Sequence, residues 1–451
     1  MPTILVILAA ALLLAPTSAR AEQLCDPAFQ DCRAKLLAYI NNEKIRIDFA
    51  ANLFEDKVLA DALVARHRAG LRIRGIIETR RTTTNPLHKA VLDQFKAAGI
   101  PLRGKSSGAV FHWKMFMFAG QQVVEFAATN FSAEYLVPVT PYVNYTVDPL
   151  YFSTDLALVH SFQRKFDDLW MDTAAFVNLS NAATPARAYA LWTVDPTLSF
   201  VPNENFLTRS KPYYDAETTG IDTVMYKITE PGHADGLIRA AKRGVPVRLI
   251  VEGGEYRDKA NLWQAYNVDR LYAAGVKVKV RASAGFLHQK TTLLYGQAVT
   301  IFGSSNWTTQ ANRDAYEHNY FTKKSWFFTW MKEIFERKWF NRTGNIETKN
   351  FVPLPPDPPV NVGPVNASSG QPLTIVLSWK PGLWAHRADV YFGTTDPPPL
   401  FRAGVTVSPG LTAVKKYSIS GLTAGRTYYW RVVSKTMAGK SASGPRWSFG
   451  T

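Results

Sequence analysis

Short apolar runs alternate with amphipathic stretches over most of the first 350 residues. IRIDFA at 45–50 predicts a buried strand, residues 56–69 carry apolar positions on one helical face, and LRIRGIIE at 71–78 is a second apolar run. The same order returns as TVMYKIT at 223–229, a helical stretch near 234–243 and VPVRLIVE at 245–252. This alternation predicts β-α-β-α-β units and therefore an α/β fold, with mostly parallel strands that are buried on both faces.

The two halves of this region also share their spacings. In each half a glutamate follows a glycine by eight positions, from Gly70 to Glu78 and from Gly244 to Glu252. A histidine also follows a later glycine by 13 positions, from Gly99 to His112 and from Gly275 to His288. Matched intervals of this kind indicate an internal repeat. We predict a first α/β repeat over residues 22–200 and a second over 201–350, packed about a pseudo-two-fold axis.

The last hundred residues differ in character from the repeats. Residues 351–364 are rich in proline and predict a stiff, extended linker. Residues 365–451 contain short alternating runs separated by turns, which is typical of an all-β sandwich. With Trp379, Tyr428 and Trp430 in its expected core, this segment resembles a fibronectin type III domain. We assign these three residues to packing rather than to catalysis.

The N-terminus has the features of an export signal. An apolar run follows the start, and Ala19-Arg20-Ala21 reads as a cleavage site, so we expect residues 1–21 to be a signal peptide and the protein to be secreted or periplasmic. Export favours a disulfide between Cys25 and Cys32, the alternative being two unpaired thiols.

Composition narrows the function classes. Two cysteines among 451 residues exclude a disulfide-dense scaffold and a cysteine-rich zinc module. The formal net charge of +16 favours anionic partners such as nucleic acid, anionic lipid or phosphate-bearing substrates, without selecting among them.

The strongest chemical signal is a duplicated H-x-K motif with an asparagine 18 residues after each histidine. The two sets are His112, Lys114 and Asn130, and His288, Lys290 and Asn306. In each half the motif precedes an apolar strand, a Gly-Gln turn and a second apolar strand that leads to the asparagine. The neighbouring Trp113 and Trp307 either line a cleft or pack in the strand core.

This duplication has a specific chemical meaning. Residues i and i+2 of a strand share a face, so each histidine is expected beside its own lysine, and the hairpin can bring the asparagine close to both. Two such units about a pseudo-two-fold axis would supply two imidazoles, two ammonium groups and two amides to one cleft. That set suits a phosphodiester, because the lysines and asparagines hold its oxygens while one histidine attacks phosphorus and the other protonates the leaving oxygen. Such chemistry requires no metal and no cofactor.

Residues 40–345 resemble the phospholipase D superfamily on these motifs. The second copy matches best, with Gly303-Ser304-Ser305-Asn306, and Glu317 matches the family carboxylate that orients a catalytic histidine. The resemblance implies a phosphohistidine intermediate, with His112 as nucleophile and His288 as general acid. The chain departs from the family pattern where Ala119 and Tyr295 replace the motif aspartates, where Ala127-Ala128 replaces Gly-Ser, and where Pro141 stands at the place of Glu317.

Three functions are compatible with this reading. We expect a secreted phosphodiesterase of phospholipase D type that hydrolyses phospholipid headgroup bonds at a membrane surface, working as a monomer. The first alternative is a secreted, metal-independent nuclease on the same scaffold, because a strongly basic protein also suits a polyanion. The second is a catalytically weakened protein that binds phosphate or anionic lipid. The sequence does not identify a partner for the C-terminal domain.

Overall fold

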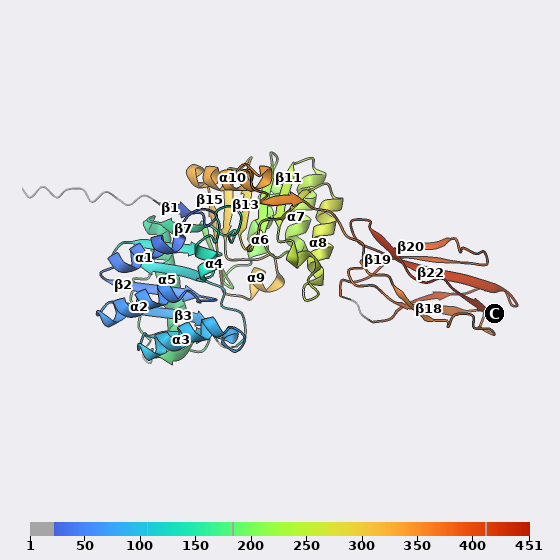
Figure 1. The fold of residues 1–451 in the computed structure, drawn as a ribbon, viewed down its shortest axis with the longest axis horizontal. Helices are drawn as coiled ribbons and strands as arrows, with labels where there is room; N and C mark the ends of the chain where they lie inside the picture. Colours follow the sequence, from blue (N-terminus) through green and yellow to red (C-terminus); the bar gives the residue numbers. More distant parts are fainter. Residues whose placement is uncertain (1–21, 106, 183–184, 411–412) are drawn as a thin grey trace, which may run out of the picture.

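The computed structural model describes residues 22–105, 107–182, 185–410 and 413–451. Two α/β lobes lie side by side, and an all-β part projects from the second lobe (Figure 1). The predicted signal peptide lies outside the described residues. Within those residues, no helix has the length and apolar character needed to cross a membrane.

The first lobe is an eight-stranded sheet with helices on its faces. Its elements are β1 (Gln23–Cys25), α1 (Cys32–Asn42), β2 (Arg46–Ala51), α2 (Lys57–Arg68), β3 (Arg72–Glu78), η1 (Arg80–Thr83), α3 (Pro86–Ala97), β4 (Leu102–Lys105), β5 (Lys114–Phe118), β6 (Val123–Ala127), α4 (Ala133–Leu136), β7 (Leu150–Ser153), α5 (Leu156–Met171) and β8 (Val177–Ser180).

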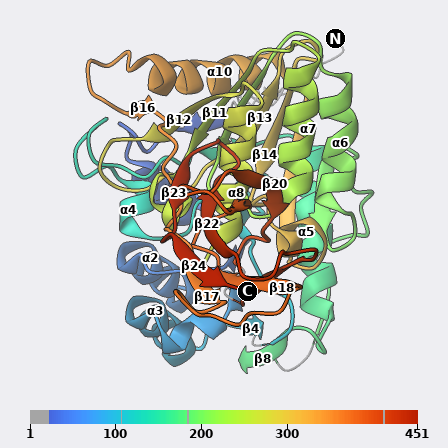
Figure 2. The ribbon, with the colours of Figure 1, turned by 90° about the vertical axis from the view of Figure 1, so that its right-hand side faces the viewer.

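The second lobe repeats this plan. Its elements are β9 (Leu198–Val201), α6 (Phe206–Ala216), β10 (Ile221–Met225), α7 (Pro231–Lys242), β11 (Val247–Val251), η2 (Gly254–Arg257), α8 (Leu262–Ala273), β12 (Lys277–Arg281), β13 (Lys290–Leu294), β14 (Val299–Gly303), α9 (Thr309–Arg313), β15 (Glu317–Thr322), α10 (Ser325–Phe340) and β16 (Thr348–Asn350). Helices α6 and α7 stand side by side over this sheet (Figure 2).

The strand order is the same in both sheets, which confirms the duplicated α/β fold. The first runs β1-β7-β6-β5-β2-β3-β4-β8 and the second β9-β15-β14-β13-β10-β11-β12-β16. Among the described strands, parallel pairing is confined to β2-β3-β4 and β10-β11-β12. The prediction of mostly parallel strands is therefore wrong. Each H-x-K strand forms a hairpin with the strand that follows it, and it also pairs antiparallel with β2 in the first lobe or β10 in the second. A buried apolar run looks the same in parallel and antiparallel pairings. Burial of the central strands on both faces is confirmed.

One glutamate fixes the H-x-K hairpin turn in each lobe. Glu43 Oε1 accepts hydrogen bonds from the backbone amides of the α1–β2 connection and from Gly120 N (2.8 Å) at the turn of β5 and β6. Glu217 Oε1 does the same in the second lobe, with Gly296 N at 2.8 Å. Each buried carboxylate thus satisfies several amides that would otherwise be unpaired, and it sets the register of the strand that carries the lysine.

A continuous apolar core joins the two lobes. Phe162 of α5 packs on Phe200 of the second sheet with ring centroids 5.4 Å apart, and Phe327 of α10 packs on Tyr151 of the first sheet at 4.9 Å. Trp113 and Trp307 are both buried, each within the apolar core of its lobe, which favours the packing role.

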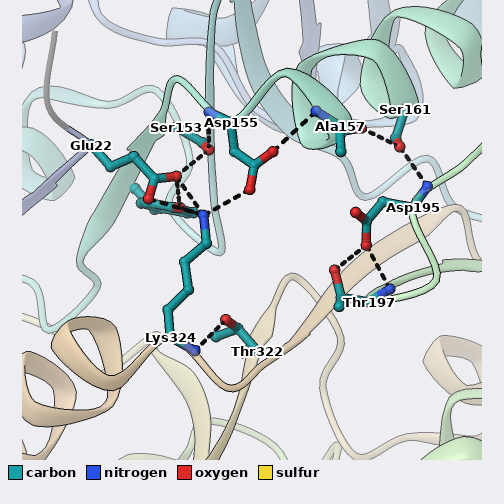
Figure 3. Close-up of polar contacts among 10 residues, drawn as sticks. Glu22, Ser153, Asp155, Ala157, Ser161, Asp195, Thr197, Thr322 and Lys324 are labelled. Atoms are coloured by element: carbon teal, nitrogen blue, oxygen red, sulfur yellow. Dashed lines mark hydrogen bonds and ion pairs between the residues drawn. The ribbon is translucent and has the colours of Figure 1, made fainter. Parts of the chain in front are cut away.

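An ionic cluster also spans the junction (Figure 3). Lys324, between β15 and α10, donates to Glu22 Oε1 (2.7 Å) and to Asp155 Oδ2 (2.9 Å) of the first lobe. Glu22 in turn accepts a bond from Ser153 Oγ at 2.7 Å, so the start of the described chain is tied to both lobes. Just after it, Cys25 and Cys32 form the favoured disulfide between β1 and α1, so the alternative of two unpaired thiols is wrong.

The C-terminal part contains two β-sheets. Its strands are β17 (Val360–Gly363), β18 (Ile375–Lys380), β19 (Arg387–Gly393), β20 (Leu400–Thr406), β21 (Lys415–Ile419), β22 (Thr427–Lys435), β23 (Ser441–Ser443) and β24 (Trp447–Gly450). Trp379, Tyr428 and Trp430 are buried between the sheets, as predicted, and Tyr428 Oη accepts a bond from Thr423 N at 2.9 Å. Tyr266 of α8 contacts His386 at 5.2 Å between ring centroids, which docks this part on the second lobe.

Glu125 on β6 is a buried acid in an apolar setting. Its side chain is fully buried, and neither carboxyl oxygen has a hydrogen-bond partner in the described part of the chain. Burial raises its pKa well above the usual range. The repeat offset of 176 between His112 and His288 puts Ile301 at the corresponding place in the second lobe.

We therefore expect Glu125→Ile to stabilise the fold by about 1–3 kcal/mol, because it removes a buried unsatisfied polar group. A carboxyl whose pKa is raised by folding contributes most to stability below its unfolded pKa and loses that contribution as the pH rises. The gain should accordingly be larger at pH 8 than at pH 5. Urea unfolding of both proteins at the two pH values measures it, and a variant less stable than the parent would contradict the assignment.

Candidate active site

Each H-x-K segment is held by backbone hydrogen bonds to the other lobe. His112 N donates to the carbonyl oxygen of Tyr316 (2.9 Å), and His288 N donates to that of Val147 (3.1 Å). Tyr316 lies just before β15 and Val147 lies shortly before β7, which are corresponding strands of the two lobes. These two hydrogen bonds place Glu317, after Tyr316, and Asp148, after Val147, beside the histidine of the opposite lobe.

Those two residues are carboxylates, and each binds the imidazole across the junction. Glu317 Oε2 lies 2.9 Å from His112 Nδ1, and Asp148 Oδ2 lies 2.8 Å from His288 Nδ1. Glu317 was expected to orient a histidine. Asp148 was missed, and the inference from Pro141 that the first lobe lacks such a carboxylate is wrong. A carboxylate on Nδ1 fixes the tautomer and leaves Nε2 available for chemistry.

A second pair of acids anchors the chain just before each histidine. Glu78, at the end of β3, accepts a bond from Phe111 N (2.9 Å), and Glu252, just after β11, accepts one from Leu287 N (2.8 Å). The glycine-to-glutamate interval found in the sequence thus ends in the residue that positions each H-x-K segment.

The two lysines converge on the same buried space. Each donates to the backbone carbonyl of its own histidine, Lys114 to His112 at 2.7 Å and Lys290 to His288. Both side chains are almost fully buried. Burial lowers the pKa of Lys114, and it lowers that of Lys290 to about 7 although Asp148 acts in the opposite direction. The lowered pKa values mean that the two neighbouring ammonium charges lack full compensation, so an anionic ligand in this space would stabilise their charged forms.

Burial favours the neutral form of both imidazoles in the free site. Burial lowers the pKa of His112 to about 4 against the opposing effect of Glu317, and it lowers that of His288 well below the usual value, with Lys290 and Lys114 adding to the effect. Burial raises the pKa of Asp148 to about 7. The two histidines differ in access, since His112 is 15% exposed and His288 is 6% exposed.

Aromatic rings surround His288. Tyr135 and Tyr226 lie 5.4 and 5.2 Å from it between ring centroids, and Phe286 lies 6.3 Å away. Asn130, which is buried, contacts Tyr135, and its Oδ1 has no hydrogen-bond partner among the described residues. Asn306 Oδ1 is likewise without a partner in that part of the chain, so both amide oxygens keep the capacity to accept a hydrogen bond.

The departures from the motif are accommodated by other residues. Ser304 Oγ bonds to Glu317 in the second lobe, and Thr129 Oγ1 bonds to the carbonyl oxygen of Asp148 (2.9 Å) in the first, where Ala128 lacks a hydroxyl. Tyr295 Oη donates to Asp222, which also pairs with Arg248.

Ala119 and Tyr295 follow β5 and β13, at the ends opposite the lysines. Each lies five positions along the chain from its lysine, a distance of about 16 Å in a strand. The loss of the motif aspartates therefore leaves the charges around the imidazoles intact.

All seven candidate residues, namely His112, Lys114, Asn130, His288, Lys290, Asn306 and Glu317, thus lie along the lobe junction or on the strands that lead to it. In the described ranges, no group of three or more His, Cys, Asp or Glu side chains is placed to hold a metal ion.

Comparisons with known proteins agree on the repeated region. The family described as "Cardiolipin synthase, PLD-like domain" matches residues 36–170 and 215–339. Mitochondrial cardiolipin hydrolase of Chlamydomonas reinhardtii is 30% identical over 105 residues (23% of this chain and 44% of that protein), and the human one is 28% identical over 145 residues (31% and 54%). The chain thus spans about half the length of these curated relatives.

Solved structures share the fold. Phosphatidylserine synthase of Haemophilus influenzae superposes with a TM-score of 0.58 at 13% identity, covering 74% of this chain and 88% of the other. Polyphosphate kinase of Porphyromonas gingivalis gives a TM-score of 0.51 at 15% identity, covering 78% and 52%.

Proposed function

The chain belongs to the PLD-like domain family of cardiolipin synthase type, and on that premise we propose that it hydrolyses the headgroup phosphodiester bond of glycerophospholipids. The observation that carries the proposal is that each histidine is bound by a carboxylate of the opposite lobe, close to two buried lysines. The lipid relatives favour a phospholipid over other phosphodiesters.

In this mechanism the two histidines divide the work. We assign the attack on phosphorus to His112 Nε2. The His112 imidazole is neutral, is bound by Glu317 and is more exposed than that of His288. The P–N bond forms as the P–O bond to the headgroup breaks, and His288 gives its proton to the departing oxygen. Water then attacks phosphorus, His288 takes a proton from it, and the P–N bond breaks to release phosphatidic acid.

The lysines and asparagines stabilise the phosphoryl oxygens during both steps. Lys114 and Lys290 balance the charge of the non-bridging oxygens, and the amides of Asn130 and Asn306 donate to them. An anionic phosphodiester in this space also raises the pKa of His288, so the general acid takes up its proton as the substrate binds.

The activity should depend on pH in a bell-shaped manner. Below about pH 4, His112 becomes protonated and loses its nucleophilic lone pair, so kcat/KM falls. Above about pH 7, Lys290 loses its charge, so kcat/KM falls again. Initial rates at subsaturating lipid from pH 3 to 9 test this. Lys290→Arg, which stays charged, should move the upper limb to higher pH, and a flat profile would refute the assignment.

Turnover assays separate this proposal from its two alternatives. The purified protein is offered phosphatidylglycerol vesicles, phosphatidylcholine vesicles and plasmid DNA, with and without EDTA. Headgroup release that persists in EDTA supports the lipid hydrolase. Nicking of DNA that falls steeply with salt, without lipid turnover, supports the nuclease. Binding without turnover of either supports the binding protein.

Three further expectations belong to the same proposal. Export through residues 1–21 would place the enzyme in a secreted or periplasmic setting, where phospholipid surfaces are accessible. The C-terminal sheets would act as a fibronectin type III-like spacer or adhesion module. The protein would work as a monomer, since both halves of the site come from one chain.

A further inference from the structure

The disulfide between Cys25 and Cys32 closes a short loop, here the disulfide loop, which lies against the part of the first lobe that carries Asp148. The carbonyl oxygen of Ala28 in this loop accepts a hydrogen bond from Tyr142 N (2.8 Å). Tyr142 belongs to residues 137–148, the long connection between α4 and β7. Cys25 itself pairs with the first residue of β7, two positions after Asp148. The disulfide loop therefore holds the chain on both sides of Asp148.

A second ionic cluster extends this contact toward Asp148. Arg337 of α10 donates to Asp26 of the disulfide loop, and its Nε lies 3.3 Å from Glu347 Oε2. Glu347 also accepts a hydrogen bond from the hydroxyl group of Tyr145, three residues before Asp148. The side chain of Arg337 is 12% exposed, and both of its acidic partners are almost fully buried. Because the loss of one partner leaves a buried charge uncompensated, these contacts hold the long connection firmly.

Glu317, the corresponding carboxylate, is supported differently in the described residues. Both cysteines of the chain belong to the disulfide loop. Glu317 follows Asp148 by 169 positions, and the same offset takes Arg337 back to Asp168. The side chain of Asp168 is 29% exposed and pairs with Arg187 at 2.7 Å between Oδ1 and Nη2. The disulfide loop and Arg337 therefore support Asp148 rather than Glu317.

We propose that the disulfide loop and Arg337 position His288, by holding the long connection so that Asp148 Oδ2 stays on His288 Nδ1. The inference rests on the proposed hydrolase function. The two elements act through Asp148, 2.8 Å from the imidazole, and they are positioning groups rather than catalytic ones. Proton donation to the leaving oxygen and activation of water, the two tasks of His288, therefore depend on them. The attack by His112, whose carboxylate lies on the second lobe, does not.

Two variants remove this support without altering the residues around the phosphodiester. Cys25→Ala/Cys32→Ala opens the disulfide loop, and Arg337→Met breaks the ionic link between Asp26 and Glu347. We expect each variant to lower kcat for phosphatidylglycerol vesicles about tenfold, with KM within about twofold of the parent value. Arg337→Lys keeps the positive charge and should recover part of the loss.

The two chemical steps distinguish positioning of His288 from a general structural role. A p-nitrophenyl phosphodiester has a leaving group that needs no proton, so its first turnover reports on His112. We expect the rate of that first turnover to stay at the parent value in both variants. Steady-state turnover of the same substrate, which needs His288 to activate water, should fall about tenfold. Arg342→Met is the matched control and should leave all rates unchanged, because this arginine is exposed and pairs with Glu336.

Nitrogen-15 NMR of the histidine side chains gives a readout that does not depend on activity. In the parent, His288 should show one fixed tautomer with the proton on Nδ1. In both variants its signals should average between the two tautomers, whereas His112 should keep its own.

An unchanged His288 signal, parental lipid kinetics in both variants, or an equal loss in both chemical steps would overturn the inference. If the parent turns over no lipid while the tautomer of His288 still depends on Arg337, the hydrolase function alone is overturned. Thermal unfolding verifies that each variant is folded at the assay temperature. Asp26→Asn, which removes the charge that Arg337 binds, replaces the cysteine variant if that variant does not fold.

Discussion

Replacing His288 with alanine should reduce phospholipid turnover by about 10³- to 10⁴-fold, because the departing alkoxide loses its proton donor. A p-nitrophenyl phosphodiester needs no such proton, so the first step on that substrate should remain fast in the variant. The second step still lacks a base for water. We therefore expect a burst of one nitrophenolate per enzyme followed by slow turnover.

The burst also distinguishes the two histidines. Intact-mass measurement of His288→Ala after the burst should find an acid-labile phosphoryl adduct, which maps to His112. His112→Ala should give neither burst nor adduct on either substrate. A burst in His112→Ala that is absent from His288→Ala would reverse the two roles. His288→Asn, which keeps a hydrogen-bonding group near Asp148, guards against an effect of unfolding.

Asp148→Asn should lower kcat by about 10²- to 10³-fold with little change in KM, since Asp148 acts by holding His288 rather than by binding lipid. Glu317→Gln should have a comparable effect through His112. The upper limb of the pH profile should also move to lower pH in Asp148→Asn, because the variant lacks the negative charge that stabilises protonated His288. A purely structural role would not alter that limb.

Asp314→Asn is a control for the change in charge, since this exposed acid lies close in sequence to Glu317 but touches neither histidine in the described contacts. Its kcat should equal that of the parent. An Asp148→Asn variant with parental kcat would show that the carboxylate in the first lobe is dispensable.

The repeat made much of this site visible in the sequence. Equal intervals around His112 and His288 predicted two lobes of one design, and the Gly-Gln turns predicted the hairpins that carry the lysines. The sequence did not identify Asp148 as a site residue, because it lies 18 residues after Asn130, whereas Glu317 lies 11 residues after Asn306. Because the connection after Asn130 is longer than the one after Asn306, the sequence does not show that Asp148 corresponds to Glu317. The structure shows it, since Val147 and Tyr316 each bond to the H-x-K segment of the opposite lobe.

Strand direction could not be read from the same patterns. Residues of β5 and β6 are buried on both faces, and such runs carry no alternation that would distinguish parallel from antiparallel neighbours.

The ionic cluster at Lys324 has a practical consequence for producing this protein. If a leader is removed after Ala21, Glu22 becomes the first residue of the processed chain, and its carboxylate already holds Lys324. A purification tag fused at that end would crowd the junction of the two lobes. Removal of one further residue would delete Glu22 and leave Asp155 as the carboxylate partner of Lys324. Recombinant forms are better tagged after Thr451, beyond the sheets that lie farthest from the junction.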